Sequence, residues 1–147
     1  SGEGLSLLKR KHPDKQMDLV LGSYFDEPFG EGFDAAVSVQ TMHHFTHEQK
    51  LILYRKIFDA LKPGSLYLET DYVADTQERE DFFFGEYARL KQEQNLGDGF
   101  FHYDTPCTVE NQLSLLRQAG FEPAVLRWQV ENTAILAAVK PADTTRK

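Results

Sequence analysis

Short apolar runs and helix-spaced apolar stripes alternate along this chain, and each predicts one element. Residues 17–21 and 34–39 are brief apolar runs next to glycines, which is typical of interior strands. Residues 65–73 are rich in β-forming side chains with partial alternation and predict a third strand. Ala124–Val130 and Thr133–Val139 are separated by only two residues, so they predict an antiparallel hairpin.

Four segments carry the spacing or the end signals of helices. Thr46 opens the best-marked one, because its hydroxyl can cap free N–H groups and Gln49 completes a capping box. Asp75 is predicted to cap a helix that runs to about residue 96, and Thr108 a last helix. Residues 4–11 hold three leucines before a basic group, which predicts a short helix.

A strand, a helix and a further strand in this order form a β-α-β crossover, which implies parallel strands. The fold class expected is therefore α/β: a Rossmann-like three-layer sandwich with a mostly parallel sheet and an antiparallel C-terminal hairpin. Residues 1–141 are expected to form one partial domain, and the polar residues 142–147 a frayed tail.

Charge, cysteine content and the length of apolar runs exclude or disfavour several classes of function. The chain has 147 residues and a formal charge of −7, which disfavours general attraction to nucleic acids. Cys107 is the only cysteine, so an intrachain disulfide and a thiol zinc cluster are excluded, and a reducing compartment is expected. No apolar run approaches the roughly 18 residues of a membrane span, so we expect a soluble, cytoplasmic protein without a membrane partner.

Three strings carry a resemblance to a known family. They are GSYFDEPFGEGFDAAVSVQTMHHF, LYRKIFDALKPGSLYLETDYV and LLRQAGFEPAVLRWQVENTAILAAVK. In this order they resemble the class I S-adenosylmethionine-dependent methyltransferases over nearly the whole chain. The resemblance implies a Rossmann-like fold, S-adenosyl-L-methionine as the cofactor and a small-molecule methyl acceptor.

The resemblance also implies that the beginning of the domain is missing. Family members start with a strand, a glycine-rich turn and a helix, and the G-x-G triplets of this chain do not have that context. The chain thus resembles the C-terminal two-thirds of the domain, N-terminally incomplete, and is expected to be inactive by itself. The strand at residues 34–39 would then be an open edge, which we expect a second copy of the chain or a segment from before residue 1 to cover.

Cofactor-binding residues are expected where the first two strands end. After the first strand, the position of Ser23 is commonly an aspartate in the family, which makes its neighbour Tyr24 the better candidate for the adenine. After the second strand, the resemblance places Ser38, Val39 and Gln40 beside the cofactor. All five can also be read as ordinary core or turn residues.

Catalytic residues are expected beside the acceptor. His43 follows the second strand, and Asp71 and Tyr72 lie at the end of the third. Either the acid or the phenol could orient the acceptor or take its proton, although a solvated strand end explains them too. Residues 75–107 occupy the family's substrate-recognition insertion, which makes His102 and Tyr103 candidate substrate-binding residues.

The histidine-rich turn is a candidate for a metal site. His43, His44 and His47 are dense enough to bind zinc, but adjacent residues point apart and no acid or thiol has a supporting spacing. We therefore expect no metal ligand.

Two other functions stay open at this point. The string LRWQVENTAILAAVK resembles the terminal hairpin of tRNA wobble-uridine modification enzymes of the carboxy-S-adenosylmethionine synthase type. The missing glycine-rich turn is also compatible with a non-catalytic interaction module that kept the fold. The interpretation that we favour from the sequence is a small-molecule methyltransferase.

Overall fold

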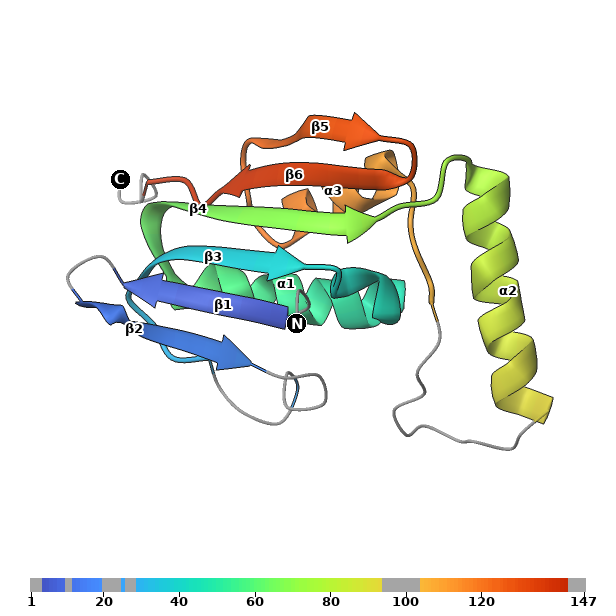
Figure 1. Cartoon of the computed structure of the whole chain (residues 1–147), viewed down its shortest axis with the longest axis horizontal. Coiled ribbons are helices and arrows are strands. Elements are labelled where there is room, and N and C mark those ends of the chain that lie inside the picture. Colours follow the sequence, from blue (N-terminus) through green and yellow to red (C-terminus); the bar gives the residue numbers. More distant parts are fainter. Residues whose placement is uncertain (1–3, 10–11, 20–24, 26–28, 94–103, 143–147) are drawn as a thin grey trace.

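The computed structural model describes residues 4–9, 12–19, 25, 29–93 and 104–142 (Figure 1). They form a six-stranded sheet with the strand order β2-β1-β3-β4-β6-β5. The strands are β1 (Gly4–Lys9), β2 (His12–Leu19), β3 (Phe33–Val39), β4 (Leu61–Tyr72), β5 (Ala124–Val130) and β6 (Thr133–Val139). The helices are the short 3-10 turn η1 (Met42–His44), α1 (His47–Ala60), α2 (Gln77–Glu93) and α3 (Val109–Gln118).

The α/β class and the C-terminal hairpin are confirmed, but the sheet is less parallel than predicted. Only β3 and β4 pair in parallel among the described strands, whereas β1 pairs antiparallel with both β2 and β3. On the other side, β6 pairs antiparallel with β4 and with β5. The β3-α1-β4 crossover is therefore the part of the sheet that has the expected parallel geometry.

Residues 4–11 do not form the predicted helix. Leu5 and Leu7 are buried while Ser6 and Leu8 are only half-buried, so the apolar positions alternate with the period of a strand. As β1, this segment pairs along β3 from Gly4 opposite Val39 to Leu8 opposite Ala35. The prediction that residues 34–39 form an open edge is therefore wrong, since the same chain covers them. The expected homodimer, in which a second copy pairs with residues 34–39, therefore has no open strand to pair with there.

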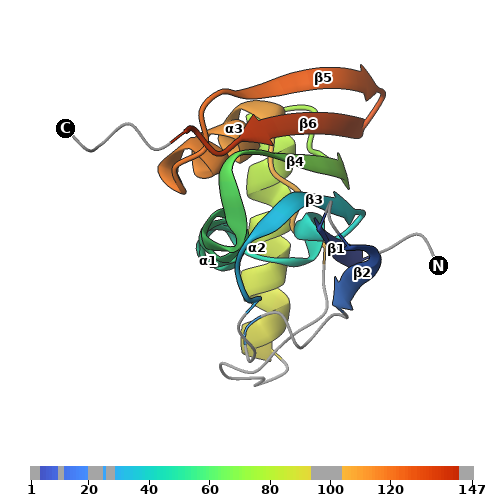
Figure 2. The ribbon, with the colours of Figure 1, turned by 90° about the vertical axis from the view of Figure 1, so that its left-hand side faces the viewer.

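The described helices lie on one face of the sheet or beyond its end. Figure 2 shows α1 and α3 on the same face, whereas α2 stands beyond the carboxyl end of β4 in Figure 1. The described residues thus make two layers, where three were expected. The capping box of α1 is confirmed, because Thr46 Oγ1 accepts from the Gln49 N–H and the Gln49 side chain accepts from the Thr46 N–H. Helix α2 is capped by Thr76 instead of Asp75.

The core lies between the sheet and the two helices α1 and α3. Alternate residues of β4 and β6 are buried, as expected for strands with one covered face. Large buried side chains from α1, β4 and the turn after α3 meet there: Leu53, Tyr54, Ile57, Tyr67 and Phe121. No helix among the described residues is long and apolar enough to cross a membrane.

Gly120 ends α3 in a conformation that only glycine tolerates well, which gives a stability test. Its φ is +117°, and a Cβ there would come within 2.9 Å of the Phe58 ring. We expect Gly120→Ala to lower the free energy of unfolding by at least about 1–3 kcal/mol in urea titrations. The matched control is Gly85→Ala in α2, where nothing lies within 4 Å. It should be neutral or stabilise by up to about 1 kcal/mol. Equal effects of the two substitutions would contradict the strain argument.

Candidate active site

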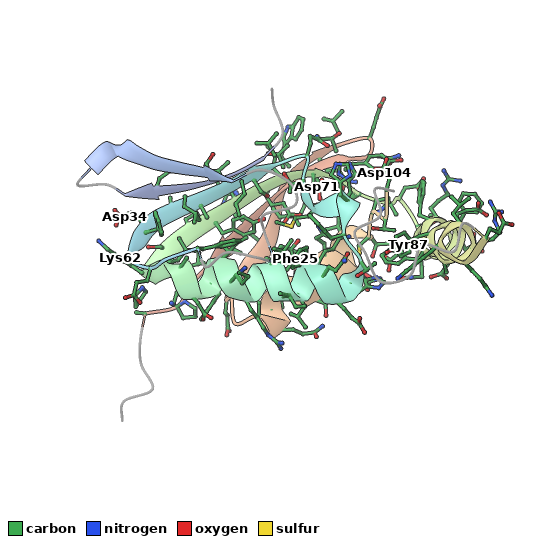
Figure 3. All side chains as sticks on the ribbon, turned by 90° about the horizontal axis from the view of Figure 1, so that it is seen from below. Phe25, Asp34, Lys62, Asp71, Tyr87 and Asp104 are labelled. Atoms are coloured by element: carbon green, nitrogen blue, oxygen red, sulfur yellow. The ribbon has the colours of Figure 1, made fainter. Side chains whose placement is uncertain are left out.

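The candidate active site lies at the carboxyl ends of β3 and β4, the only described neighbouring strands that pair in parallel. The turn η1 follows β3 directly, and its His43 and His44 are buried. Asp71 is the penultimate residue of β4 and is fully buried. Figure 3 shows Asp71 and Asp104 next to this turn. In open α/β sheets, ligands bind at this end of parallel strands.

Hydrogen bonds fix the turn on two sides. Thr41 Oγ1 accepts from the Gly4 N–H at 3.1 Å and lies 2.9 Å from the carbonyl oxygen of Val39, so the start of β1 is held against the end of β3. On the other side, the Thr105 N–H donates to the carbonyl oxygen of His43, and Thr105 Oγ1 donates to that of Phe45 at 2.7 Å. Neither attachment uses an imidazole ring, so the rings of His43 and His44 are left for other contacts.

His43 and Asp71 form a buried pair. His43 Nδ1 lies 2.7 Å from Asp71 Oδ1, with both side chains at most 9% exposed. Burial acts to lower the pKa of His43, but the hydrogen bond and the negative charge of Asp71, helped by Asp104, outweigh it and raise that pKa. Within the described part of the chain, Asp71 Oδ2 has no hydrogen-bond partner. Asp71 thus orients the imidazole and directs Nε2 away from β4.

Nε2 of His43 faces Asp104, which was not a predicted site residue. The Asp104 carboxylate oxygen Oδ1 lies 3.7 Å from His43 Nε2 and 3.4 Å from His44 Nδ1. Tyr72 completes this side, since its ring meets the His43 ring edge-on with centroids 5.8 Å apart. The structure therefore brings His43, Asp71 and Tyr72 together, as expected for three predicted catalytic residues, although a role in catalysis stays a prediction.

A second acid, Glu69, is buried beneath this site. The hydroxyl of Tyr54 donates to Glu69 at 2.7 Å, that of Tyr67 at 3.0 Å, and the amide of Gln112 is a third donor. Burial and the nearby charge of Asp71 raise the pKa of Glu69 to about 7, against the opposing effect of these hydrogen bonds. The solvated strand end that the sequence suggested for Asp71 is thus wrong, because Asp71 is fully buried as well.

Polar contacts also attach α2 and the segment before α3 to α1. Glu80 accepts hydrogen bonds from the Thr108 N–H and the Asn111 amide, and its other oxygen lies 2.7 Å from His47 Nε2. The buried Lys50 ammonium donates to the carbonyl oxygen of Thr105 and to Cys107 Sγ. Burial raises the pKa of the Cys107 thiol to about 11, as expected for a thiol enclosed by the fold.

The predicted cofactor residues are described only in part. Ser38 is fully buried and its hydroxyl lies 2.7 Å from the Tyr67 hydroxyl, so its side chain belongs to the Glu69 network. Val39 and Gln40 are half-buried at the end of β3, with Gln40 at a positive φ of 52°. Cofactor contacts by these three stay predictions. The other candidates, Ser23, Tyr24, His102 and Tyr103, lie outside the described residues.

These residues fit one side of a cofactor site. Val39 and Gln40 are half-buried at the carboxyl end of β3, so their backbone and the Gln40 amide offer polar groups at the end of the sheet where ligands bind. The strand beside β3 is β1, which runs antiparallel and brings its first residue, Gly4, to this end. Among the described residues, no glycine-rich turn leads from a strand into a helix here, so the opposite side of such a site is not represented.

Comparison with known proteins decides the fold family. No family model matches the chain. The human N-acetylserotonin methyltransferase in complex with SAM superposes with a TM-score of 0.59 at 21% identity, covering 87% of this chain and 35% of that chain. The S-adenosylmethionine-dependent methyltransferase SibL gives a TM-score of 0.58 at 23% identity, with 80% and 34% covered. This chain has the class I methyltransferase fold.

A curated relative points the same way by sequence. The 24-methylenesterol C-methyltransferase 3 of Arabidopsis thaliana is 31% identical over 74 residues, which are 50% of this chain and 20% of the relative. The predicted resemblance to S-adenosylmethionine-dependent methyltransferases is thereby confirmed. The chain spans about a fifth of that relative's length and about a third of the methyltransferase structures. These relatives give no support to the tRNA-modification or interaction-module alternatives.

The raised pKa of Glu69 predicts a pH dependence of stability. Because the pKa is about 7 in the folded chain against an ordinary 4.5, the folded state holds more protons between these values. The free energy of unfolding should therefore fall as the pH rises through this window, by up to about 3 kcal/mol. Urea titrations of Glu69→Gln should show a weaker fall than the parent chain. The exposed-residue control Glu78→Gln should retain the full fall, and parallel pH profiles of all three would contradict the assignment.

Proposed function

We propose that the protein containing this chain is an S-adenosylmethionine-dependent methyltransferase that acts on a small-molecule acceptor. The observation that carries the proposal is the buried His43–Asp71 pair at the carboxyl edge of β3 and β4. The fold family supports it, and so do the activities for which the similar proteins are named, which are methyl transfer to a sterol and to N-acetylserotonin. The cofactor residues proposed are Val39 and Gln40, with Ser38 acting through the backbone of β3.

The proposed chemistry divides between the cofactor and this chain. The sulfonium of bound S-adenosylmethionine supplies an activated methyl group, so positioning of the acceptor provides much of the catalysis. Asp71 holds the Nδ1–H of His43, which leaves the lone pair on Nε2 to accept the proton of an acceptor N–H or O–H group. Tyr72 and Phe83, in edge contact with centroids 6.4 Å apart, provide an aromatic wall next to that imidazole.

Substitution of the pair tests the proposed proton transfer. In the full-length natural protein, we expect His43→Gln and Asp71→Asn to lower kcat by about 10²–10⁴-fold, because the general base is lost or wrongly oriented. The Kd for S-adenosylmethionine, measured by calorimetry, should change little. His47→Gln is the matched control, since His47 begins α1 and contacts Glu80 instead of Asp71. A loss of kcat in His47→Gln as large as in His43→Gln would reject this assignment.

The 147-residue chain by itself should bind S-adenosylmethionine weakly or not at all. Val39 and Gln40 are the cofactor contacts that we propose for this chain. The acidic residue that holds the cofactor ribose in the family, and the backbone donors of the glycine-rich turn, are not among the described residues, and each such contact is worth about 1.5–3 kcal/mol. Loss of two such contacts weakens binding by roughly 10²–10⁴-fold. Calorimetry with the isolated chain, verified as folded by circular dichroism, measures this directly. Micromolar affinity would contradict the prediction.

A further inference from the structure

Three potential metal ligands converge on one point at the edge of the candidate active site. They are His43 Nε2, His44 Nδ1 and Asp104 Oδ1, supplied by the turn η1 and by the segment before α3. Potential ligand atoms of these three residues all lie within 4.8 Å of one another. Asp104 is 54% exposed at the side chain, so this point is open to solvent on one side.

The separations suit a cation between the three groups. Ligand atoms that bind zinc at about 2.0–2.2 Å lie roughly 3.0–3.5 Å from each other. Asp104 Oδ1 is 3.4 Å from His44 Nδ1 and 3.7 Å from His43 Nε2, so both carboxylate–imidazole separations are close to this range. The two imidazoles offer ligand atoms within 4.8 Å of each other. We propose that His43, His44 and Asp104 bind a divalent transition-metal cation of the zinc type. Two imidazoles and one carboxylate are the ligands that such cations prefer.

The surrounding contacts support metal binding by His43. Metal-binding histidines usually donate their other ring N–H to a carboxylate, and His43 Nδ1 lies 2.7 Å from Asp71 Oδ1. That contact fixes the tautomer in which Nε2 carries a lone pair. The three ligands are also held together without the cation, because Thr105, next to Asp104, is bound to the backbone of His43 and Phe45.

This inference reverses the expectation drawn from the sequence. Adjacent histidines were expected to point apart, but in η1 the rings of His43 and His44 lie with their centroids 4.2 Å apart. The missing acidic ligand comes from Asp104, which lies 60 residues further along the chain and has no recognisable spacing.

A second cluster on the molecule is a weaker candidate. His47, Glu80 and Cys107 also have ligand atoms within 4.8 Å of one another. The Lys50 ammonium already lies 3.0 Å from Cys107 Sγ, and Glu80 accepts from a backbone N–H and an amide. A cation there would face a fixed positive charge and oxygens already in use. It serves as the control site.

The inference goes beyond the proposed function and does not need it. The two are linked only through Nε2 of His43, because a lone pair bound to a cation cannot accept a proton. The cation-bound form would therefore lack the base that methyl transfer uses.

Binding of cobalt(II), a visible probe for zinc sites, tests the proposal without any methyl transfer. The 147-residue chain is prepared without a histidine tag, confirmed as folded by circular dichroism, and titrated while its visible absorption is recorded. Zinc is then added in competition. We expect a saturable cobalt spectrum at one equivalent that zinc abolishes. Asp104→Ala, at an exposed position, and His44→Gln should each weaken binding at least tenfold.

Two further variants distinguish binding at His43, His44 and Asp104 from binding at the control site. His47→Gln should bind cobalt as tightly as the parent chain, whereas Asp71→Asn should weaken binding about 10–100-fold through the orientation of His43. The folded parent chain giving no saturable spectrum would overturn the proposal, and so would loss of binding in His47→Gln or unchanged binding in Asp104→Ala. Failure of methyl transfer in the full-length protein, with cobalt binding intact, would count against the proposed function alone.

Discussion

Two carboxylates on the covered face of a central strand constrain the candidate site and much of the core. Glu69 and Asp71 are two residues apart on β4, so both side chains point to the same side of the sheet, and both are fully buried. A buried carboxylate without hydrogen bonds would cost several kcal/mol, which no marginally stable domain tolerates easily. Each therefore requires dedicated partners from the elements packed over β4.

The partners of these acids come from separate elements. Glu69 takes Tyr54 from α1, Tyr67 from its own strand and Gln112 from α3. Asp71 takes His43 from the turn after β3. The same polar requirement thus positions two helices against the sheet and fixes the imidazole that we assign to proton transfer. Core packing and site geometry are two results of one electrostatic constraint.

Local signals allowed much of the fold to be predicted from the sequence. The capping box at Thr46 and the two-residue connection of the hairpin act within a few residues, and both are present as expected. The first strand was mistaken for a helix because Leu5, Leu7 and Leu8 satisfy both periods in so short a run. Pairing with β3 decides between them, and that pairing joins residues about 30 positions apart.

In the candidate site too, local signals indicate some residues, whereas others are found only from contacts across the fold. His43, Asp71 and Tyr72 could be selected because they lie at or just beyond the ends of strands, and the end of a strand is visible in the sequence. Asp104 and Lys50 could not, since their roles depend on contacts across the fold: Asp104 faces the histidine turn, and Lys50 is buried between Thr105 and Cys107. A buried lysine has no sequence signature, because its position in α1 resembles that of any exposed one.

The attachment of α2 has a consequence for how the molecule moves. Its only fully buried residue is Glu80, and the helix stands beyond the sheet (Figure 1). Polar contacts and a few half-buried rings, instead of a hydrophobic core, therefore attach it to the rest of the molecule. Such contacts exchange readily with water, whereas the strands beneath bury many apolar side chains. Helix α2 is therefore the described helix for which we expect local opening at a lower free energy than that of the sheet. Such opening would expose the side of the molecule that carries Tyr72 and His47.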